Sequence, residues 1–152
     1  MSLNLRYTEG MKKTTSLKEL VENGLSETED LNCAETILYA ANRAYGLQMP
    51  HSALKLAAGF GGGMGIGSTC GALTGSIMAL SAIFVKDRGH ESDYIKTLNA
   101  ELFESFRSRM ESFDCDYLKE HYRSPQDSCH PIILAAAEIT EALIDREIGL
   151  QS

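Results

Sequence analysis

The sequence has no tryptophan, only three prolines in 152 residues, and no segment with the apolar–polar alternation of a β-strand. With so few helix-breaking residues, helix is the favoured secondary structure throughout. The chain also lacks an excess of basic side chains, because 14 Lys and Arg oppose 21 Asp and Glu, for a formal net charge of −7. A chain of this charge repels phosphate backbones and anionic lipid, so we expect no nucleic-acid binding.

The N-terminus lacks the apolar core and the small-residue cleavage site of a secretory signal. We therefore expect a cytoplasmic protein, in a compartment that keeps thiols reduced. The length suits one domain, which we place at residues 14–152, with residues 1–13 as a flexible N-terminal extension.

Charged residues are absent between Lys55 and Lys86, and the stretch 66–85 is long enough to cross a bilayer. That stretch contains several Gly, Ser and Thr residues, and no belt of aromatic residues frames it. The pattern favours a central helix covered by other helices, so we expect no membrane span.

Helical periodicity and capping residues predict an all-α, single-domain bundle of about five to six helices with up-down topology. A glycine-rich connection precedes its central helix. The expected helical segments are 16–24, 30–45, 50–60, 68–86 with a Ser68 or Thr69 cap, 92–110, a short turn at 116–121, and 131–148.

Four cysteines, Cys33, Cys70, Cys115 and Cys129, carry the clearest functional signal, although none belongs to a C-x-x-C pair. Each lies at or near the expected N-terminus of a helix, where the helix dipole stabilises thiolate over thiol. Antiparallel order brings these helix starts to one end of the bundle, so we expect the four sulfurs to meet there. The competing interpretation is that the cysteines are small buried hydrophobes.

Acidic residues and a histidine surround the last two cysteines. His130 follows Cys129 and is a candidate ligand, or a group that lowers the pKa of that thiol. The acidic residues between positions 114 and 127 oppose thiolate formation unless a metal ion or a helix dipole compensates.

The glycine cluster at 61–67 is not a phosphate loop, because no strand precedes it and no Lys-Ser/Thr pair follows. We interpret it either as a flexible connection whose bare backbone approaches a sulfur centre, or as a tight crossing between helices. The candidate cofactor-binding glycines are Gly63, Gly65, Gly67 and Gly71.

Small residues also repeat every four positions in the central segment, at Gly71, Gly75 and Ala79. This spacing indicates close helix packing, either within the bundle or across a homodimer.

The run Cys70-Gly71-Ala72-Leu73-Thr74-Gly75, together with the Asn32-Cys33-Ala34 segment and two later lone cysteines, resembles the C_GCAxxG_C_C family of small redox-active proteins. The resemblance covers roughly residues 31–142 and implies redox activity without naming a reaction. A related helical module occurs in split-Soret cytochromes, but the haem-attachment motif Cys-x-x-Cys-His is absent, so no c-type haem is implied.

Two mechanisms fit the cysteines. In the first, all four ligate an iron–sulfur cluster that exchanges electrons with an unknown redox partner protein. In the second, they form thiol/disulfide pairs in which Cys70 attacks and another cysteine resolves the mixed disulfide. The lack of a C-x-x-C pair favours the cluster. The alternative is a structural zinc site or a helical interaction protein without redox chemistry.

Overall fold

The computed structural model describes residues 11–149, and within that range it contains helices and turns but no strand. The all-α prediction is confirmed, with more helices than expected. They are α2 (Leu17–Glu22), α3 (Leu25–Glu29), α4 (Cys33–Ala44), α5 (His51–Leu54), α6 (Gly71–Phe84), α7 (Tyr94–Met110), α8 (Cys115–Tyr122) and α9 (His130–Glu147), with the 3₁₀ helices η1 (Lys55–Phe60) and η3 (Gly89–Glu91) and the π-helical turn η2 (Gly63–Gly67).

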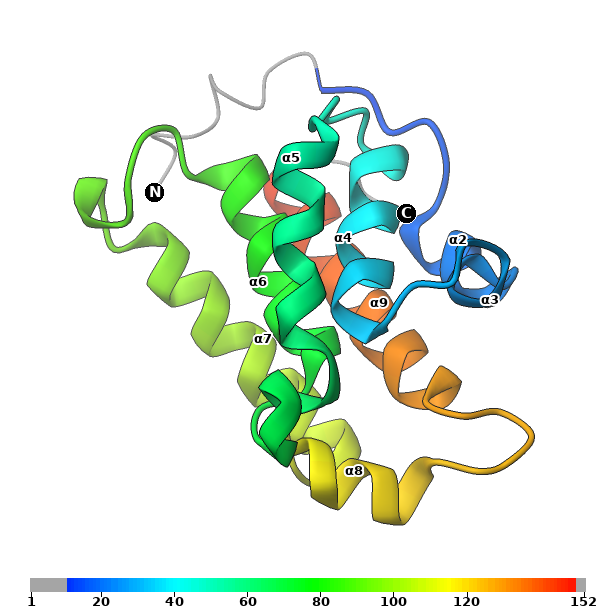
Figure 1. Cartoon of the computed structure of the whole chain (residues 1–152). Helices are drawn as coiled ribbons and strands as arrows, with labels where there is room; N and C mark the ends of the chain where they lie inside the picture. Colours follow the sequence, from blue (N-terminus) through cyan, green and yellow to red (C-terminus); the bar gives the residue numbers. More distant parts are fainter. Residues whose placement is uncertain (1–10, 150–152) are drawn as a thin grey trace.

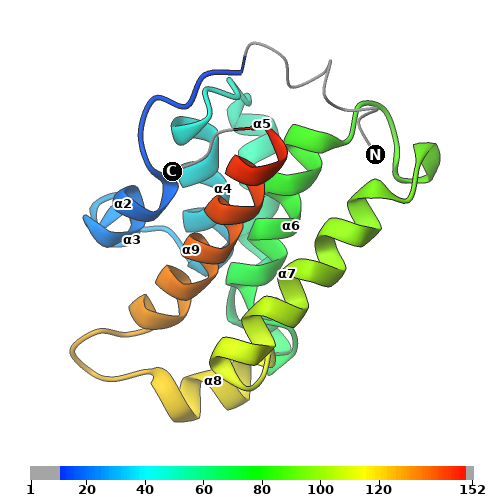
Figure 2. The same cartoon turned by 180° about the vertical axis from the view of Figure 1, so that it is seen from behind.

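Three helices, α4, α6 and α9, form the centre of the bundle (Figures 1 and 2). Helix α7 packs against α6 and α9 on one side, and α2 packs against α4 and α9 on the other. Helix α8 lies at one end of the bundle, at the bottom of both views, and contacts η2 and the start of α9. This end of the molecule carries the first residues of α6, α8 and α9.

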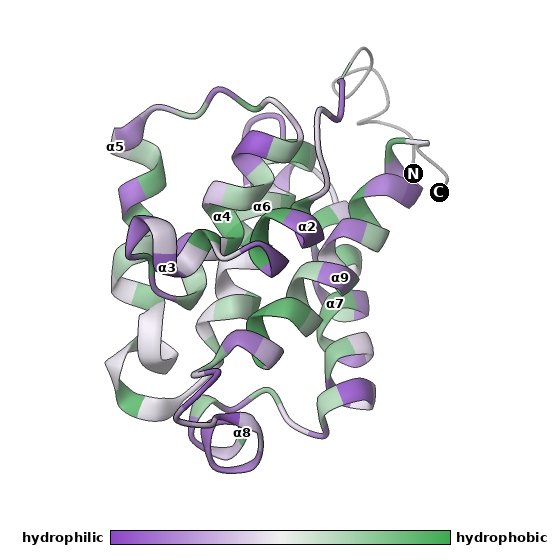
Figure 3. Cartoon of the chain, turned by 90° about the vertical axis from the view of Figure 1, so that its right-hand side faces the viewer, coloured by the Kyte–Doolittle hydropathy of each residue, from purple (hydrophilic) through white to green (hydrophobic). Residues whose placement is uncertain are grey.

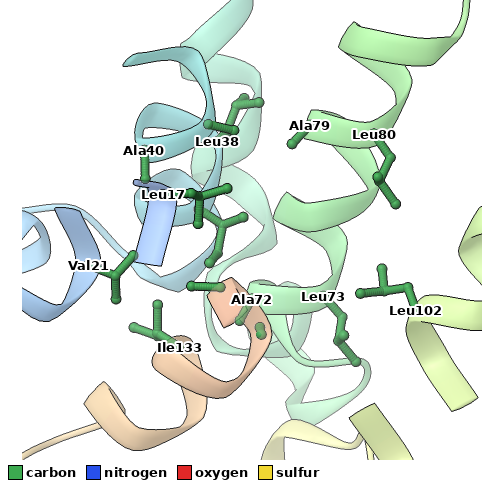
Figure 4. Close-up of a cluster of buried hydrophobic side chains, with 14 of the residues drawn as sticks. Leu17, Val21, Leu38, Ala40, Ala72, Leu73, Ala79, Leu80, Leu102 and Ile133 are labelled. Carbon is green, nitrogen blue, oxygen red and sulfur yellow. The ribbon is translucent and has the colours of Figure 1, made fainter. Parts of the chain in front are cut away.

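The core is built from aliphatic side chains that these helices direct inward, many of them small (Figure 4). Alanines on α4 and α6 let these two helices approach closely. Leucines on α6 and α7 fill the space between α6 and α7. Hydrophilic colours dominate α8 in Figure 3, as expected for a helix at the end of the bundle with one covered side.

The small-residue stripe of α6 is used inside the chain. A Cβ added to Gly75 would lie 2.5 Å from the backbone oxygen of Ala34, so only glycine permits this approach of α6 to α4. Ala79 is fully buried. The packing interpretation of the stripe within the bundle is therefore confirmed, and the homodimer stays a prediction.

Two of the expected helices have different boundaries. The expected segment 16–24 ends at Glu22, and a separate helix, α3, begins after Gly24, whose φ of +91° requires a residue without a side chain. The expected segment 50–60 is α-helical for one turn only and continues as the 3₁₀ helix η1.

The expected cap of the central helix was also misplaced. Helix α6 begins at Gly71 with Cys70 as its N-cap, because Thr69 is held extended in an antiparallel bridge with Asp114. The helix ends at Phe84, two residues before the expected end.

Of the expected N-terminal extension, residues 1–10 lie outside the described residues. Met11 packs against the core, and the Lys13 ammonium lies 2.8 Å from a Glu141 oxygen and 2.6 Å from an Asp145 oxygen. The described chain is therefore fixed to α9 from its first residues onward.

Between residues 11 and 149, no helix combines the length and apolarity that a membrane crossing requires.

Candidate functional site

Each of the four cysteines lies at the start of a different helix, as predicted. Cys33 and Cys115 are the first residues of α4 and α8, and Cys70 and Cys129 are the N-caps of α6 and α9. All four are free thiols; Cys70 and Cys115 are buried, and the other two are half-buried.

These four cysteines line a single cavity of about 290 Å³, which we call the sulfur cavity. The convergence predicted from helix order is therefore observed. The roles assigned to the cysteines stay predictions. The other lining residues are Val21, Ser26, Glu27, Leu31, Asn32, Gly62, Leu118, Lys119, Arg123, Ser128, His130, Ile132 and Ile133.

A short antiparallel bridge ties two of the cysteines together. The Cys70 backbone N–H donates to the Phe113 carbonyl at 2.8 Å, and the Cys115 N–H donates to the Ser68 carbonyl at 2.6 Å. In this register Cys70 and Cys115 are diagonal neighbours across the bridge, a relation that puts both side chains on the same face. The bridge explains how two helices far apart in the sequence start at the same place.

Cys33 is positioned by a capping box at the start of α4. The Asn32 side chain accepts from the Glu35 N–H at 3.0 Å, and the Asn32 N–H donates to the Glu35 carboxylate at 2.9 Å. The Asn32 amide also donates to the Ala58 carbonyl at 2.9 Å, which links α4 to η1. The capping box and the hydrogen bond to η1 thus both fix the first turn of α4, which contains Cys33.

The candidate glycines fall into two groups. A Cβ on Gly71 would overlap the Cys33 sulfur, and one on Gly63 would lie 2.7 Å from the Cys115 Cβ, so both lie directly against cysteines. A Cβ on Gly67 would overlap the Asp116 carboxylate instead, and Gly65 faces open space. None of the four candidate glycines is among the residues that line the sulfur cavity, whereas Gly62, which the sequence did not single out, is.

The glycine-rich turn itself has an unusual backbone. Gly62, Gly63, Met64 and Gly65 all have positive φ, between 61° and 74°. Left-handed geometry over four successive residues explains the need for glycine here, since a side chain is tolerated at Met64 only with strain. The turn therefore has a left-handed backbone for which glycine is suited, and its flexibility stays a prediction.

Burial controls the titration of the thiols. It raises the pKa of Cys70 to about 12, against the lowering effect of the nearby Ala72 and Leu73 N–H groups at the start of α6. Burial also raises the pKa of Cys115 and of Cys129, and the proximity of Cys33 raises the pKa of all three. The expectation that helix starts favour thiolate is wrong for these three cysteines, because burial is the largest influence on the pKa of each thiol and raises it.

Two basic side chains near the sulfurs were missed by the sequence reasoning. Beside the raising effect of burial, Arg123 and Lys119 lower the pKa of Cys129, and Lys119 also lowers that of Cys115. The sequence pointed to the acidic residues of this region, and one of them, Asp116, raises the pKa of Cys115. The four-residue spacing of Lys119 and Arg123, and of Lys119 and Cys115, was the available signal.

The donors surround the cavity and do not meet at a point. Among residues 11–149, no three His, Cys, Asp or Glu side chains are grouped closely enough to hold a single metal ion. His130 lines the sulfur cavity beside Cys129, but it completes no such group.

Comparison with known proteins assigns the chain to a family. Residues 31–143 match the family model described as "Putative redox-active protein (C_GCAxxG_C_C)". The match covers most of the chain, so the protein belongs to this family of redox-active proteins. Neither the curated proteins nor the solved structures contain a match to this chain.

Proposed function

We propose that the chain is an electron carrier in which Cys33, Cys70, Cys115 and Cys129 ligate an iron–sulfur cluster. One observation carries this proposal: four thiols from four different helix starts line one cavity of about 290 Å³. When bound, such a cluster supplies one-electron transfer. The family's redox character agrees with this role.

The spacing of the donors favours a cluster over a single zinc ion. Zinc needs its ligands about 2.0–2.3 Å from one point, and no three donors in the described part of the chain are grouped in this way. A cluster is a larger body whose iron atoms are ligated from several directions, which suits thiols distributed around a cavity.

The raised pKa values also support ligation. A buried thiol beside other thiols resists losing its proton, since the resulting charge would be desolvated. Metal coordination compensates that charge and deprotonates the thiol outright. Leu118, Ile132 and Ile133 supply buried apolar walls beside the sulfurs, which lower the local polarity.

The test is anaerobic purification followed by visible absorption, iron and acid-labile sulfide assays. We expect a coloured protein, and we expect Cys70→Ser to lose both iron and sulfide. Ala72→Ser is the matched control, because it adds a hydroxyl at another buried position in the first turn of α6 and leaves every thiol in place.

Thiol/disulfide exchange is the second candidate, and a specific contact favours it. Gly71, the residue after Cys70, lies against the Cys33 sulfur, so Cys33 and Cys70 are candidates for a redox pair. A pKa of about 12 makes Cys70 a poor attacking group, so in this mechanism the half-buried Cys33 or Cys129 attacks first.

The same preparation separates the two candidates. A colourless protein that forms reversible disulfides on mild oxidation, with Cα atoms of the bonded pair about 4.4–6.8 Å apart, would replace the cluster by the dithiol mechanism. A colourless, metal-free protein whose thiols resist both alkylation and oxidation would contradict both.

A further inference from the structure

A second hollow adjoins the sulfur cavity. It has a volume of about 510 Å³, and we call it the outer cavity. Lys119, Arg123 and Ser128 line both hollows, so a molecule in the outer cavity lies directly above the wall of the sulfur cavity. The remaining residues of the outer cavity are Glu120, Ser124 and Pro125.

The loop that forms one side of the outer cavity is closed on itself. The Ser128 N–H donates to the Ser124 carbonyl at 2.8 Å, and the Ser124 N–H donates to the Ser128 carbonyl at 3.4 Å. The Asp127 N–H donates to the Ser124 hydroxyl at 2.9 Å. These bonds fix the position of Ser128 relative to the end of α8, so the outer cavity has a defined shape.

Among residues 11–149, the two cations of the outer cavity, Lys119 and Arg123, form no ion pair. Every other arginine between residues 11 and 149 forms an ion pair with a carboxylate; these are Arg43, Arg88, Arg107, Arg109 and Arg146. Within the same range, neither Arg123 nor Lys119 has a carboxylate within 4.0 Å, although Glu27 and Glu120 also line the two hollows. Among the arginines of residues 11–149, Arg123 is therefore the exception, and Lys119 lines the same two hollows in a chain whose net charge is −7.

The groups at this place complement one kind of ligand. Arginine presents a planar fork of donors that fits an oxoanion, lysine adds up to three donors, and the serine hydroxyls can donate further. All three residue types supply hydrogen to acceptor oxygens, and the two cations supply opposite charge. A neutral or cationic molecule would leave these donors unmatched.

We propose that Lys119, Arg123 and Ser128 form a binding site for a small oxoanion in the outer cavity, beside the sulfur cavity. This proposal rests on the proposed function in its second part only. If the cysteines hold a redox centre, the small molecule that exchanges electrons with that centre is an anion. The site itself requires no assumption about the centre.

The first test is sulfate binding to the full chain as purified, by calorimetric titration with ionic strength held constant by sodium chloride. Lys119→Gln and Arg123→Gln should each weaken binding about tenfold, the effect of one lost charge-assisted hydrogen bond. Lys119→Arg should retain it. Lys96→Gln is the matched control, because Lys96 is exposed on α7, away from both hollows, and the substitution makes the same change in net charge.

The second test measures oxidation rates of the reduced protein. Ferricyanide, a trianion, accepts one electron and becomes ferrocyanide; hexaammineruthenium(III), a trication, also accepts one electron. The overall charge of −7 favours the cation, whereas the outer cavity favours the anion, so the two effects have opposite signs. We expect ferricyanide to be the faster oxidant, and we expect Arg123→Gln to slow it severalfold without affecting the rate with the cation.

The outcomes separate this inference from the proposed function. Absence of sulfate binding, or binding that both Gln variants leave unchanged, overturns the oxoanion site. Sulfate binding that depends on Lys119 and Arg123 in a protein with no oxidisable centre supports the site and overturns the redox role. If neither Lys119→Gln nor Arg123→Gln changes the rate of oxidation by ferricyanide, the anionic reactant does not bind at this site before electron transfer.

Discussion

Two regions of the molecule bury polar groups in opposite ways. Where the N-terminal segment meets α9, Glu141 is 9% exposed, and its carboxylate accepts from the Ser16 hydroxyl at 2.9 Å, from the Leu17 N–H at 2.8 Å and from Lys13. At the other region, the sulfur cavity, Cys70 is 5% exposed and its thiol is surrounded by other thiols and apolar side chains.

The pKa values record this difference. Burial alone would raise the pKa of Glu141, yet the donors around it lower that pKa. Burial raises the pKa of Cys70, and the donors near it do not reverse the effect. The first region is therefore a completed structural cluster, whereas the second has a charged state that the chain by itself does not stabilise. A redox centre or a change of oxidation state would supply the missing stabilisation.

The largest expected effect concerns the raised pKa of the Cys70 thiol in the sulfur cavity. In the reduced chain, stripped of metal by a chelator, Cys70 should react with iodoacetamide at pH 8 roughly a thousandfold more slowly than in urea. The rate should rise about tenfold per pH unit up to a pH near 12, because only the thiolate reacts.

Mass spectrometry of the alkylated peptides measures this rate at each cysteine. Cys129 is the internal comparison: it is half-buried and close to Arg123, so it should react before Cys70. Equal alkylation rates for Cys70 in the folded and the unfolded chain would mean that burial does not raise its pKa. Cys70 would then no longer differ from Glu141 in its response to burial.

The second prediction concerns the packing that holds Cys33. Gly71→Ala should lower the free energy of unfolding by about 1–3 kcal/mol, because the new Cβ overlaps the Cys33 sulfur and lies 2.8 Å from the Phe60 carbonyl oxygen. Gly59→Ala is the control: Gly59 has an ordinary φ and no atom within 4 Å of an added Cβ. Urea denaturation measures the free energy of unfolding of both variants. Equal stability would show that the packing around Gly71 and the Cys33 sulfur accommodates a methyl group without cost.

The third prediction concerns the completed cluster. Glu141→Gln should lower the free energy of unfolding at pH 7 by about 1–3 kcal/mol, since it removes the charge from a buried, multiply bonded carboxylate. Because the pKa of Glu141 is lowered by folding, its contribution is complete above its ordinary pKa of 4.5 and disappears as the pH falls through the folded value.

The difference between wild type and Glu141→Gln should therefore vanish in acid, as followed by thermal melts between pH 7 and pH 3. Glu104→Gln is the surface control, with an exposed ion pair to Arg107 and an expected change of no more than about 1 kcal/mol. A stability difference that is independent of pH would argue that Glu141 acts through its shape and not through its charge.

Much of the sulfur cavity was readable from the sequence. Capping residues placed the helix starts within a few residues of their positions, although the cap of α6 is Cys70 and not Ser68 or Thr69, and antiparallel order brought the four cysteines together. Both inferences depend on local pattern and chain direction, which sequence periodicity reports well.

The sequence did not predict the raised pKa values of the thiols, nor the position of Lys119 and Arg123 beside the sulfur cavity. Whether a helix dipole or desolvation dominates depends on how deeply a side chain is buried, and depth is a property of the packed bundle. Likewise, Lys119 and Arg123 reach the sulfurs because α8 lies across the end of the bundle, an orientation that no spacing within α8 specifies. Helix α3 escaped prediction because it has only five residues and no side-chain cap.

The smallest expected effect compares two helix caps, one at the sulfur cavity and one remote from it. Asn32→Ala removes the hydrogen bond to the Glu35 N–H and should lower the free energy of unfolding by about 1 kcal/mol. Asp93→Ala, at the N-cap of α7, should change stability by no more than a few tenths of a kcal/mol, because the Asp93 side chain makes no capping hydrogen bond. Only Asn32→Ala should also speed alkylation of Cys33, since Asn32 both caps α4 and lines the cavity. Loss of stability without faster alkylation would mean that the cap secures the helix but not the position of its first cysteine.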